Sequence, residues 1–177
     1  MKKPPVFSSP PILLHPFSRG TGKSLSVAEV AELCELLAPY PVLLVGVPGE
    51  PVPPTWPGNV TDLLGRTSLP ELIHLIRQAA WTVSVDSGPM HLAAGLSDRV
   101  LSLHSWSNPA MVGPWRPEAW VLRESRLVRV RDLRPDEFPE RRDRQSEYAK
   151  RDRLLAPADL AYLAGFLRTQ LAETPTE

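Results

Sequence analysis

The sequence predicts an α/β fold built on a Rossmann-like, doubly wound parallel sheet. Leu- and Val-rich runs without polar alternation are typical of parallel strands covered on both faces, and residues 42–45 are one such run. These runs alternate with segments of helical periodicity through residue 104, which indicates right-handed strand–helix–strand crossovers. The 177 residues, of which 42% are hydrophobic, can form one domain with a sizeable core.

The strands are predicted from short apolar runs bounded by proline, glycine or charged residues. In chain order these runs are residues 12–15, 42–45, 59–64, 81–85 and 100–103, followed by the weaker runs 120–122 and 127–130.

The helices are predicted from N-terminal capping signals followed by apolar residues at helical spacing. They begin after Ser26, after Ser68 and at Pro89, and a closing helix covers residues 158–171. A glutamate three residues after each serine completes a capping box, and proline favours the first turn of a helix. We expect residues 1–130 to form the Rossmann-like domain. Residues 131–177 are expected to form a charged linker and a closing C-terminal helix packed on the same domain.

The composition excludes several classes of protein. Twenty basic and twenty acidic residues cancel, so no overall charge favours nucleic acid or an anionic membrane. A single cysteine, Cys34, excludes an internal disulfide framework and is interpreted as a small core residue. No run approaches 18 apolar residues, and the first residues lack the long apolar run of a signal peptide. We expect a cytoplasmic protein without a transmembrane segment, and peripheral attachment to the inner membrane stays open.

The turn that begins at Asp86 is the first candidate site. It follows a predicted strand, and Ser87 and Gly88 come where a helix leaves backbone N–H groups unpaired, with His91 about one turn into that helix. In an open α/β sheet, ligands bind at this edge, and a helix amino terminus suits a phosphate. The simpler alternative is that Asp86 and Ser87 only cap the helix.

A second loop opens at the same edge of the sheet. It carries Ser18, Arg19 and Lys23 between a predicted strand and a predicted helix, and its glycines allow close backbone approach. A cationic, hydroxyl-bearing loop beside a helix amino terminus can hold a diphosphate. Gly46 ends the next strand, and Glu50 follows it at the same edge.

Residues 18–24 also resemble a phosphate-binding P-loop, G-x-x-x-x-G-K-[ST]. Two features differ from that motif. Phe17 occupies the position of the first glycine, and Leu25 and Ser26 separate Lys23 from the predicted helix start. A degenerate P-loop nucleotide-binding enzyme therefore stays an alternative.

The histidines outside the Asp86 turn do not have the spacing of metal ligands. His74 is interpreted as a helix residue, and His15 and His104 as packing residues at strand ends. We expect no metal site.

Four segments, in consistent order over residues 11–115, resemble glycosyltransferase family 9, the bacterial heptosyltransferases. Residues 86–93 are similar to its D-[ST]-G-x-x-H signature, and residues 64–72 to its L-x-G-x-[TS]-[SL]-L-x-E-L segment. Residues 15–23 resemble its first loop, where a hydroxyl and a lysine hold the donor diphosphate. Gly46 and Glu50 resemble its G-x-x-x-E element, which contacts the nucleoside.

The resemblance implies the carboxyl-terminal half of a two-domain GT-B glycosyltransferase. That half binds the donor, typically ADP-heptose, in an inverting reaction of lipopolysaccharide biosynthesis that needs no metal. The segment before Ile12 is too short for an acceptor domain, so we expect the catalytic base to lie outside this chain. No cofactor is expected, and the ligand would be an ADP-sugar or another nucleotide diphosphate-sugar.

The resemblance also assigns roles and partners. The donor-binding residues would be Ser18, Arg19, Lys23, Gly46, Glu50, Asp86, Ser87, Gly88 and His91. The partner would be a separate acceptor-binding domain or chain, or a second copy, which meets the loop of residues 106–115 or the final helix. A non-catalytic nucleotide-sugar-binding or interaction module is the alternative to an enzyme.

Overall fold

The structure is a computed structural model that describes residues 9–173. Within these residues one seven-stranded sheet has the order β3-β2-β1-β4-β5-β6-β7. The strands are β1 Ile12–His15, β2 Val42–Leu44, β3 Val60–Asp62, β4 Trp81–Val85, β5 Val100–Leu103, β6 Trp120–Arg123 and β7 Arg126–Arg129. All neighbours are parallel except β6 and β7, which are antiparallel.

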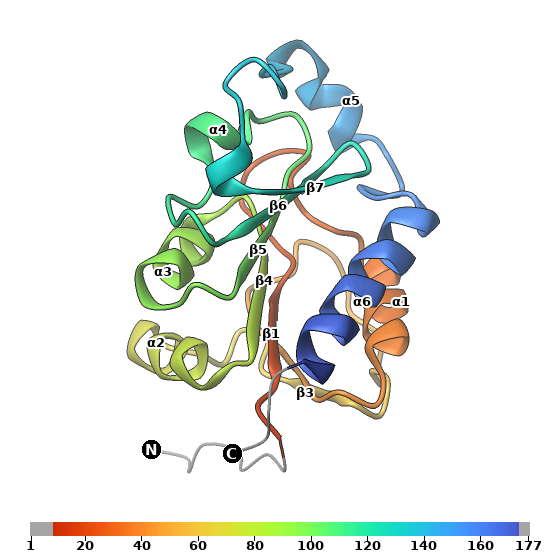
Figure 1. The fold of residues 1–177 in the computed structure, drawn as a ribbon. Helices are drawn as coiled ribbons and strands as arrows, with labels where there is room; N and C mark the ends of the chain where they lie inside the picture. The colour runs from red at the N-terminus through yellow and green to blue at the C-terminus, as the bar shows by residue number, and fades with distance from the viewer. Residues whose placement is uncertain (1–8, 174–177) are drawn as a thin grey trace.

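Helices cover both faces of this sheet (Figure 1). The helices are α1 Val27–Leu37, α2 Leu69–Gln78, α3 Gly88–Leu96, α4 Pro109–Val112, α5 Gln145–Ala149 and α6 Pro157–Ala172, with 3-10 turns η1 Val130–Asp132 and η2 Arg142–Arg144. Helices α1 and α6 lie on one face and α2 and α3 on the other, while α4 and α5 lie near the carboxyl ends of the strands (Figure 1). The predicted Rossmann-like α/β fold is confirmed.

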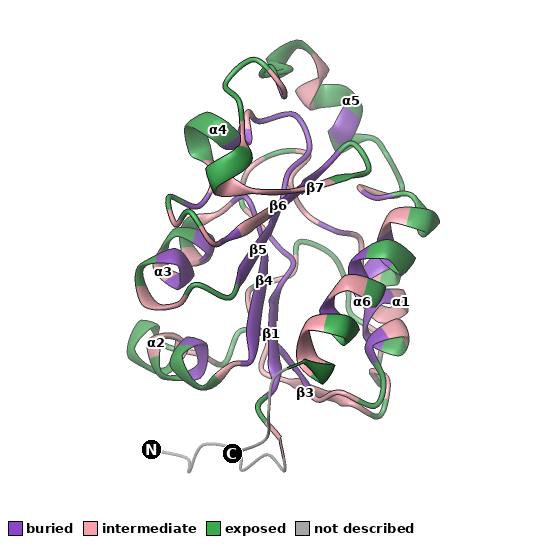
Figure 2. Ribbon diagram, in the orientation of Figure 1, coloured by how far each residue is buried: buried purple, intermediate pink, exposed green. Residues whose placement is uncertain are grey.

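The core lies in two layers, one on each side of the buried strands (Figure 2). Alternate residues of β1 enter different layers, because successive side chains of a strand point to opposite faces. Ile12 and Leu14 pack in the layer of α1 and α6, and Leu13 packs in the layer of α2 and α3. Continuous apolar runs were therefore a correct indication of strands covered on both faces.

Both predicted capping boxes are present. The Ser26 backbone N–H donates to Glu29 Oε2 at 2.8 Å, and the Ser68 backbone N–H donates to Glu71 Oε2 at the same distance. Glu29 is fully buried, and its second oxygen accepts from the backbone N–H of Leu155 at 2.7 Å. The first cap thus also ties α1 to the segment before α6.

Strand β6 begins at the predicted residue and ends one residue later than predicted, whereas β7 begins and ends one residue earlier. Glu124 and Ser125 form its turn with φ of 50° and 61°, so β6 reaches Arg123 and β7 begins at Arg126. A two-residue turn with positive φ at both positions matches the twist of the flanking strands. Neither residue is a glycine, so this turn has little sequence signal.

The charged segment after residue 131 has anchors that its composition did not indicate. Phe138 and Tyr148 are both buried, and α5 packs Tyr148 against the glycine loop between β1 and α1. The closing helix α6 packs against α1 and brings the Phe166 ring within 5.7 Å of the Trp81 ring. A domain boundary at residue 130 stays a prediction. No helix among residues 9–173 is both long and apolar enough to cross a bilayer.

Candidate functional site

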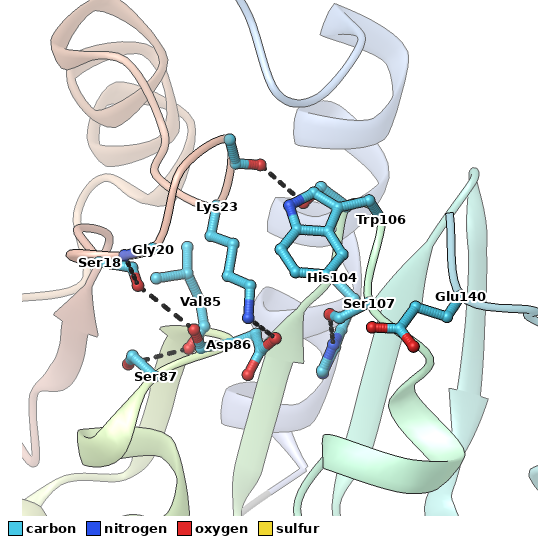
Figure 3. A network of polar contacts seen from close by, with 12 residues as sticks. Ser18, Gly20, Lys23, Val85, Asp86, Ser87, His104, Trp106, Ser107 and Glu140 are labelled. Carbon is cyan, nitrogen blue, oxygen red and sulfur yellow. Dashed lines mark hydrogen bonds and ion pairs between the residues drawn. The ribbon is translucent and has the colours of Figure 1, made fainter. Parts of the chain in front are cut away.

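The two candidate loops meet at the carboxyl ends of β1 and β4. These strands are neighbours in the sheet, and the connections from β1 run outward to β2 and β3 before the chain returns to β4. This is the point at which strand order reverses, and open α/β sheets bind ligands in the crevice outside it. Lys23 Nζ lies 2.6 Å from Asp86 Oδ2 across that crevice (Figure 3).

The Lys23 loop is held in shape by its own hydroxyls. The Ser18 backbone N–H donates to Ser24 Oγ at 2.9 Å, and Ser24 Oγ donates to the Ser18 carbonyl at 3.1 Å. The Gly20 backbone N–H donates to Ser18 Oγ at 3.0 Å. Ser18 Oγ approaches the Asp86 carbonyl oxygen to 3.5 Å, so the loop also contacts the second turn (Figure 3).

The segment after β5 supports the same loop from the other side. Ser105 Oγ donates to the Gly22 carbonyl at 2.7 Å, and Trp106 Nε1 donates to the Thr21 carbonyl at 3.0 Å. The Trp106 ring centroid lies 4.6 Å from Lys23 Nζ, which is within the range of a cation–π contact (Figure 3). The lysine therefore lies between a carboxylate and an aromatic face.

The prediction of an association surface was wrong for Trp106 and for the apolar face of α6. Trp106 is only 7% exposed because its ring and its N–H group hold the Lys23 loop. Leu160, Leu163 and Leu167 of α6 are buried against α1. The exposed large apolar side chains of the predicted surface are Met111, Val112 and Trp115 of the loop and Tyr162 of α6.

The surroundings of Asp86 favour its ionised form. Burial would raise the pKa of this carboxyl, but hydrogen bonds from Lys23 and Ser107 outweigh burial and lower the pKa below its ordinary value. An ionised carboxylate already paired with Lys23 is suited to ordering the lysine.

The simpler alternative, that Asp86 and Ser87 only cap α3, is wrong. Ser87 is the N-cap residue of α3, yet its side chain makes no capping bond. Instead Ser87 Oγ donates to the Val85 carbonyl at 3.1 Å and lies 3.3 Å from His15 Nδ1. Within residues 9–173, no acceptor takes the backbone N–H of Ser87 or Gly88, so both donors stay available at the helix amino terminus.

Gly46 lies on the far side of the same histidine. Its φ is +114°, and a Cβ there would come within 3.1 Å of the buried His15 ring. Burial lowers the pKa of His15 to about 4, so the ring is neutral at pH 7. A cavity of about 210 Å³ opens beside it, lined by His15, Val45, Gly46, Val47, Gly65, Thr67 and Leu72.

Glu50 lies at the amino terminus of α1. Its Oε1 accepts from the Val27 backbone N–H at 2.8 Å. Glu50 also lines a second cavity, of about 390 Å³, together with Gly22 of the Lys23 loop and Arg151 of the charged segment. It is therefore beside the two loops without contacting Asp86.

Only some of the predicted site residues contact one another in the structure. Ser18 and Lys23 both contact Asp86, and Ser87 and Gly46 both lie against His15, whereas Arg19 and His91 are exposed. No hydrogen bond or ion pair from the described part of the chain reaches the side chains of Arg19 or His91. Among the same residues, no three His, Cys, Asp or Glu side chains gather as a metal site.

Sequence reasoning missed the polar residues at the end of β5. His104 and Ser107 are each 2% exposed and hydrogen-bond to each other at 3.1 Å. Fully buried Arg123 donates to the carbonyls of Ser107, Phe138 and Pro139, at 2.8, 3.0 and 3.0 Å, and so fastens this segment to the chain before α5. The available signal was a polar run directly after an apolar strand, at the same edge as the two loops.

Comparisons with known proteins agree with this architecture. A model of glycosyltransferase family 9 (heptosyltransferase) matches residues 51–134, which include the Asp86 turn but not the Lys23 loop. Lipooligosaccharide heptosyltransferase 2 of Haemophilus influenzae is 33% identical over 72 residues, which are 40% of this chain and 21% of that protein. The structure of E. coli ADP-heptose lps heptosyltransferase II has a TM-score of 0.66 at 22% identity, over 95% of this chain and 48% of that one. Residues 51–134 are therefore similar to glycosyltransferase family 9 (heptosyltransferase), and the chain has the fold of part of a solved heptosyltransferase.

A further structural relative carries a ligand. It is dodecameric iron-containing heptosyltransferase TibC, from enterotoxigenic E. coli, in complex with ADP-D-beta-D-heptose. Its TM-score is 0.62 at 20% identity, over 99% of this chain and 50% of that chain. The present chain therefore spans about half the length of these solved heptosyltransferases, and its match covers 21% of the curated relative.

Proposed function

We propose that this chain binds a nucleotide diphosphate-sugar resembling ADP-heptose, as the donor half of an inverting, metal-independent glycosyltransferase. The observation that carries the proposal is the contact of Lys23 with Asp86, 2.6 Å apart, beside the Ser87 and Gly88 amides, which no acceptor among residues 9–173 takes. A cation and oriented N–H groups at one strand edge suit a diphosphate. The ADP-D-beta-D-heptose complex of TibC supports the choice of ligand.

Each residue has a role in this proposal. Ser18, Arg19 and Lys23 contact the diphosphate, and the amides of Ser87 and Gly88 donate to it. Asp86 keeps Lys23 in place and His91 lies near the sugar. Gly46 and Glu50 contact the nucleoside, whose base fits the cavity of about 210 Å³ next to Gly46.

The same groups would assist glycosyl transfer. The diphosphate gains negative charge as its bond to the sugar breaks, so donors fixed around it bind the transition state more tightly than the ground state. A base that activates the acceptor would come from a separate domain or chain. Exposed Met111 of α4 and Trp115, which follows α4, are the surface that we propose for that partner or for a second copy. A cytoplasmic location stays a prediction.

Calorimetry tests the proposal against its alternatives. The ligands are ADP, an ADP-sugar and ATP, each with and without magnesium. We expect magnesium-independent binding of ADP that is lost in Lys23→Ala, while exposed Lys150→Ala is unchanged. Strictly magnesium-dependent binding of ATP, with hydrolysis, would favour the P-loop alternative. Donor binding without transfer, when the chain is combined with an acceptor-binding half, would favour a non-catalytic binding module.

A further inference from the structure

A row of buried hydrogen-bonding side chains leads from β5 to Lys23. Ser102 Oγ lies 3.0 Å from His104 Nε2, and His104 Nδ1 lies 3.1 Å from Ser107 Oγ. Ser107 lies beside the Asp86 carboxylate and its hydroxyl lowers the pKa of that carboxyl, and Asp86 in turn pairs with Lys23 at 2.6 Å (Figure 3). Figure 3 shows His104 and Ser107 beside Asp86, on the side away from the Ser18 loop. The first three residues are at most 2% exposed.

Elementary chemistry fixes the direction of each hydrogen bond in the row. A carboxylate only accepts, so Ser107 donates its hydroxyl proton to Asp86. Ser107 Oγ then accepts from His104 Nδ1–H. The single hydroxyl proton of Ser102 goes to the unprotonated Nε2 at 3.0 Å rather than to the more distant Trp120 carbonyl at 3.4 Å. Burial lowers the pKa of His104 to about 4, which keeps the ring neutral at pH 7 as this arrangement requires.

We propose that His104 and Ser107 are positioning residues, which hold the Asp86 carboxylate so that it presents the Lys23 ammonium to the donor diphosphate. The proposal rests on the donor-binding function proposed above and extends it to residues outside the two loops. Ser102 completes the row by fixing the tautomer of His104.

A purely packing role does not account for this row. The neighbouring β5 residues Leu101 and Leu103 are apolar, and an apolar side chain at position 104 would need no buried partner. With every bond made, the row instead limits Asp86 to one orientation, because a satisfied buried network is rigid. The charged or titratable groups around it are Lys23, His91 and Arg123, which act on His104, and Lys23 and His104, which act on Asp86.

Three variants test the contributions of Ser107 and His104 separately. Ser107→Ala removes the donor to Asp86, His104→Phe removes both ring nitrogens, and His104→Asn keeps an N–H near the position of Nδ1. Thr82→Val is the matched control, because Thr82 is a similarly buried hydroxyl of the same sheet whose Oγ1 has no partner among the described residues. Affinity for ADP and for adenosine is measured for each by calorimetry.

We expect Ser107→Ala and His104→Phe to bind ADP about tenfold more weakly, the loss that one charge-assisted hydrogen bond gives. Adenosine, which lacks the diphosphate, should bind as in the unaltered protein. His104→Asn should recover most of the ADP affinity, and Thr82→Val should change neither. An equal loss of affinity for ADP and for adenosine, or no loss of ADP affinity in Ser107→Ala, would overturn the proposal.

A second measurement does not depend on nucleotide binding. Carbon NMR of the Asp86 carboxyl should give a higher pKa in Ser107→Ala, because a donor to the ionised form has been removed. If the unaltered protein fails to bind ADP, the proposed function fails, and this pKa alone then decides whether Ser107 and His104 order Asp86. An unchanged pKa of Asp86 in Ser107→Ala would refute the positioning role of Ser107 and His104, even where ADP binds.

Discussion

Replacing Lys23 by methionine should destabilise the fold in a pH-dependent way. The side chains of Lys23 and Asp86 are 19% and 8% exposed, so the variant leaves a nearly buried carboxylate without its ammonium partner. Removing one partner of a buried ion pair costs about 3–5 kcal/mol. Because the Ser107 hydroxyl still donates to Asp86, we expect the low end, a loss of about 3 kcal/mol at pH 7.

The sign of the pH dependence follows from the lowered pKa of Asp86. Its ion pair contributes stability above the ordinary aspartate pKa, and this contribution is lost as the pH falls through the lowered value. In Lys23→Met, burial raises the pKa of the Asp86 carboxyl and no lysine opposes this effect. The carboxyl therefore becomes protonated at a higher pH, and protonation removes the unpaired charge. The difference from the unaltered protein should therefore shrink between pH 7 and pH 4.

Urea unfolding at the two pH values measures this difference. A loss of about 3 kcal/mol lowers the midpoint by about 1–2 M urea at pH 7. Arg66→Met is the control, because its ion pair with Asp62 is exposed and should contribute little. An equal loss at both pH values, or a Lys23→Met midpoint like that of Arg66→Met, would refute the reasoning.

Two further stability predictions have matched controls within the chain. Glu29→Gln should cost about 2–3 kcal/mol by urea unfolding, since the buried carboxylate accepts from Ser26 and Leu155, while Glu71→Gln, in the exposed capping box, should cost clearly less. Gly22→Ala should cost about 2 kcal/mol and increase proteolysis of α5, because φ is +69° and the new Cβ meets Tyr148 Cβ at 2.9 Å. Gly49→Ala, with open space around it, should be near neutral. Equal effects within either pair would contradict these assignments.

Local signals predicted most of the fold. The capping boxes at Ser26 and Ser68 and the apolar runs of β1 and β4 depend on residues close in sequence, and the structure contains each of them. The alternation of strands and helices predicts a parallel sheet, which places the loops of Lys23 and Asp86 at the same edge, where the strands end. Their shared position could therefore be predicted before any contact between them was known.

The rest of the site depends on contacts between distant segments. The Lys23–Trp106 contact joins residues more than 80 positions apart, and His104 acts on Asp86 only through Ser107. Arg123 is a charged residue at a strand end, and its full burial depends on carbonyls of the chain before α5. Such residues look like surface or packing positions in the sequence, because their partners are fixed only by the tertiary fold.

Amide NMR during titration with ADP tests the central claim most directly. The account predicts that the largest shift changes fall on the backbone N–H groups of Ser87 and Gly88 and on the loop of Lys23. These changes should occur without magnesium and should disappear in Lys23→Ala. Changes confined to α5 and the charged residues around it, with Ser87 and Gly88 unmoved, would contradict a diphosphate site at the carboxyl ends of β1 and β4.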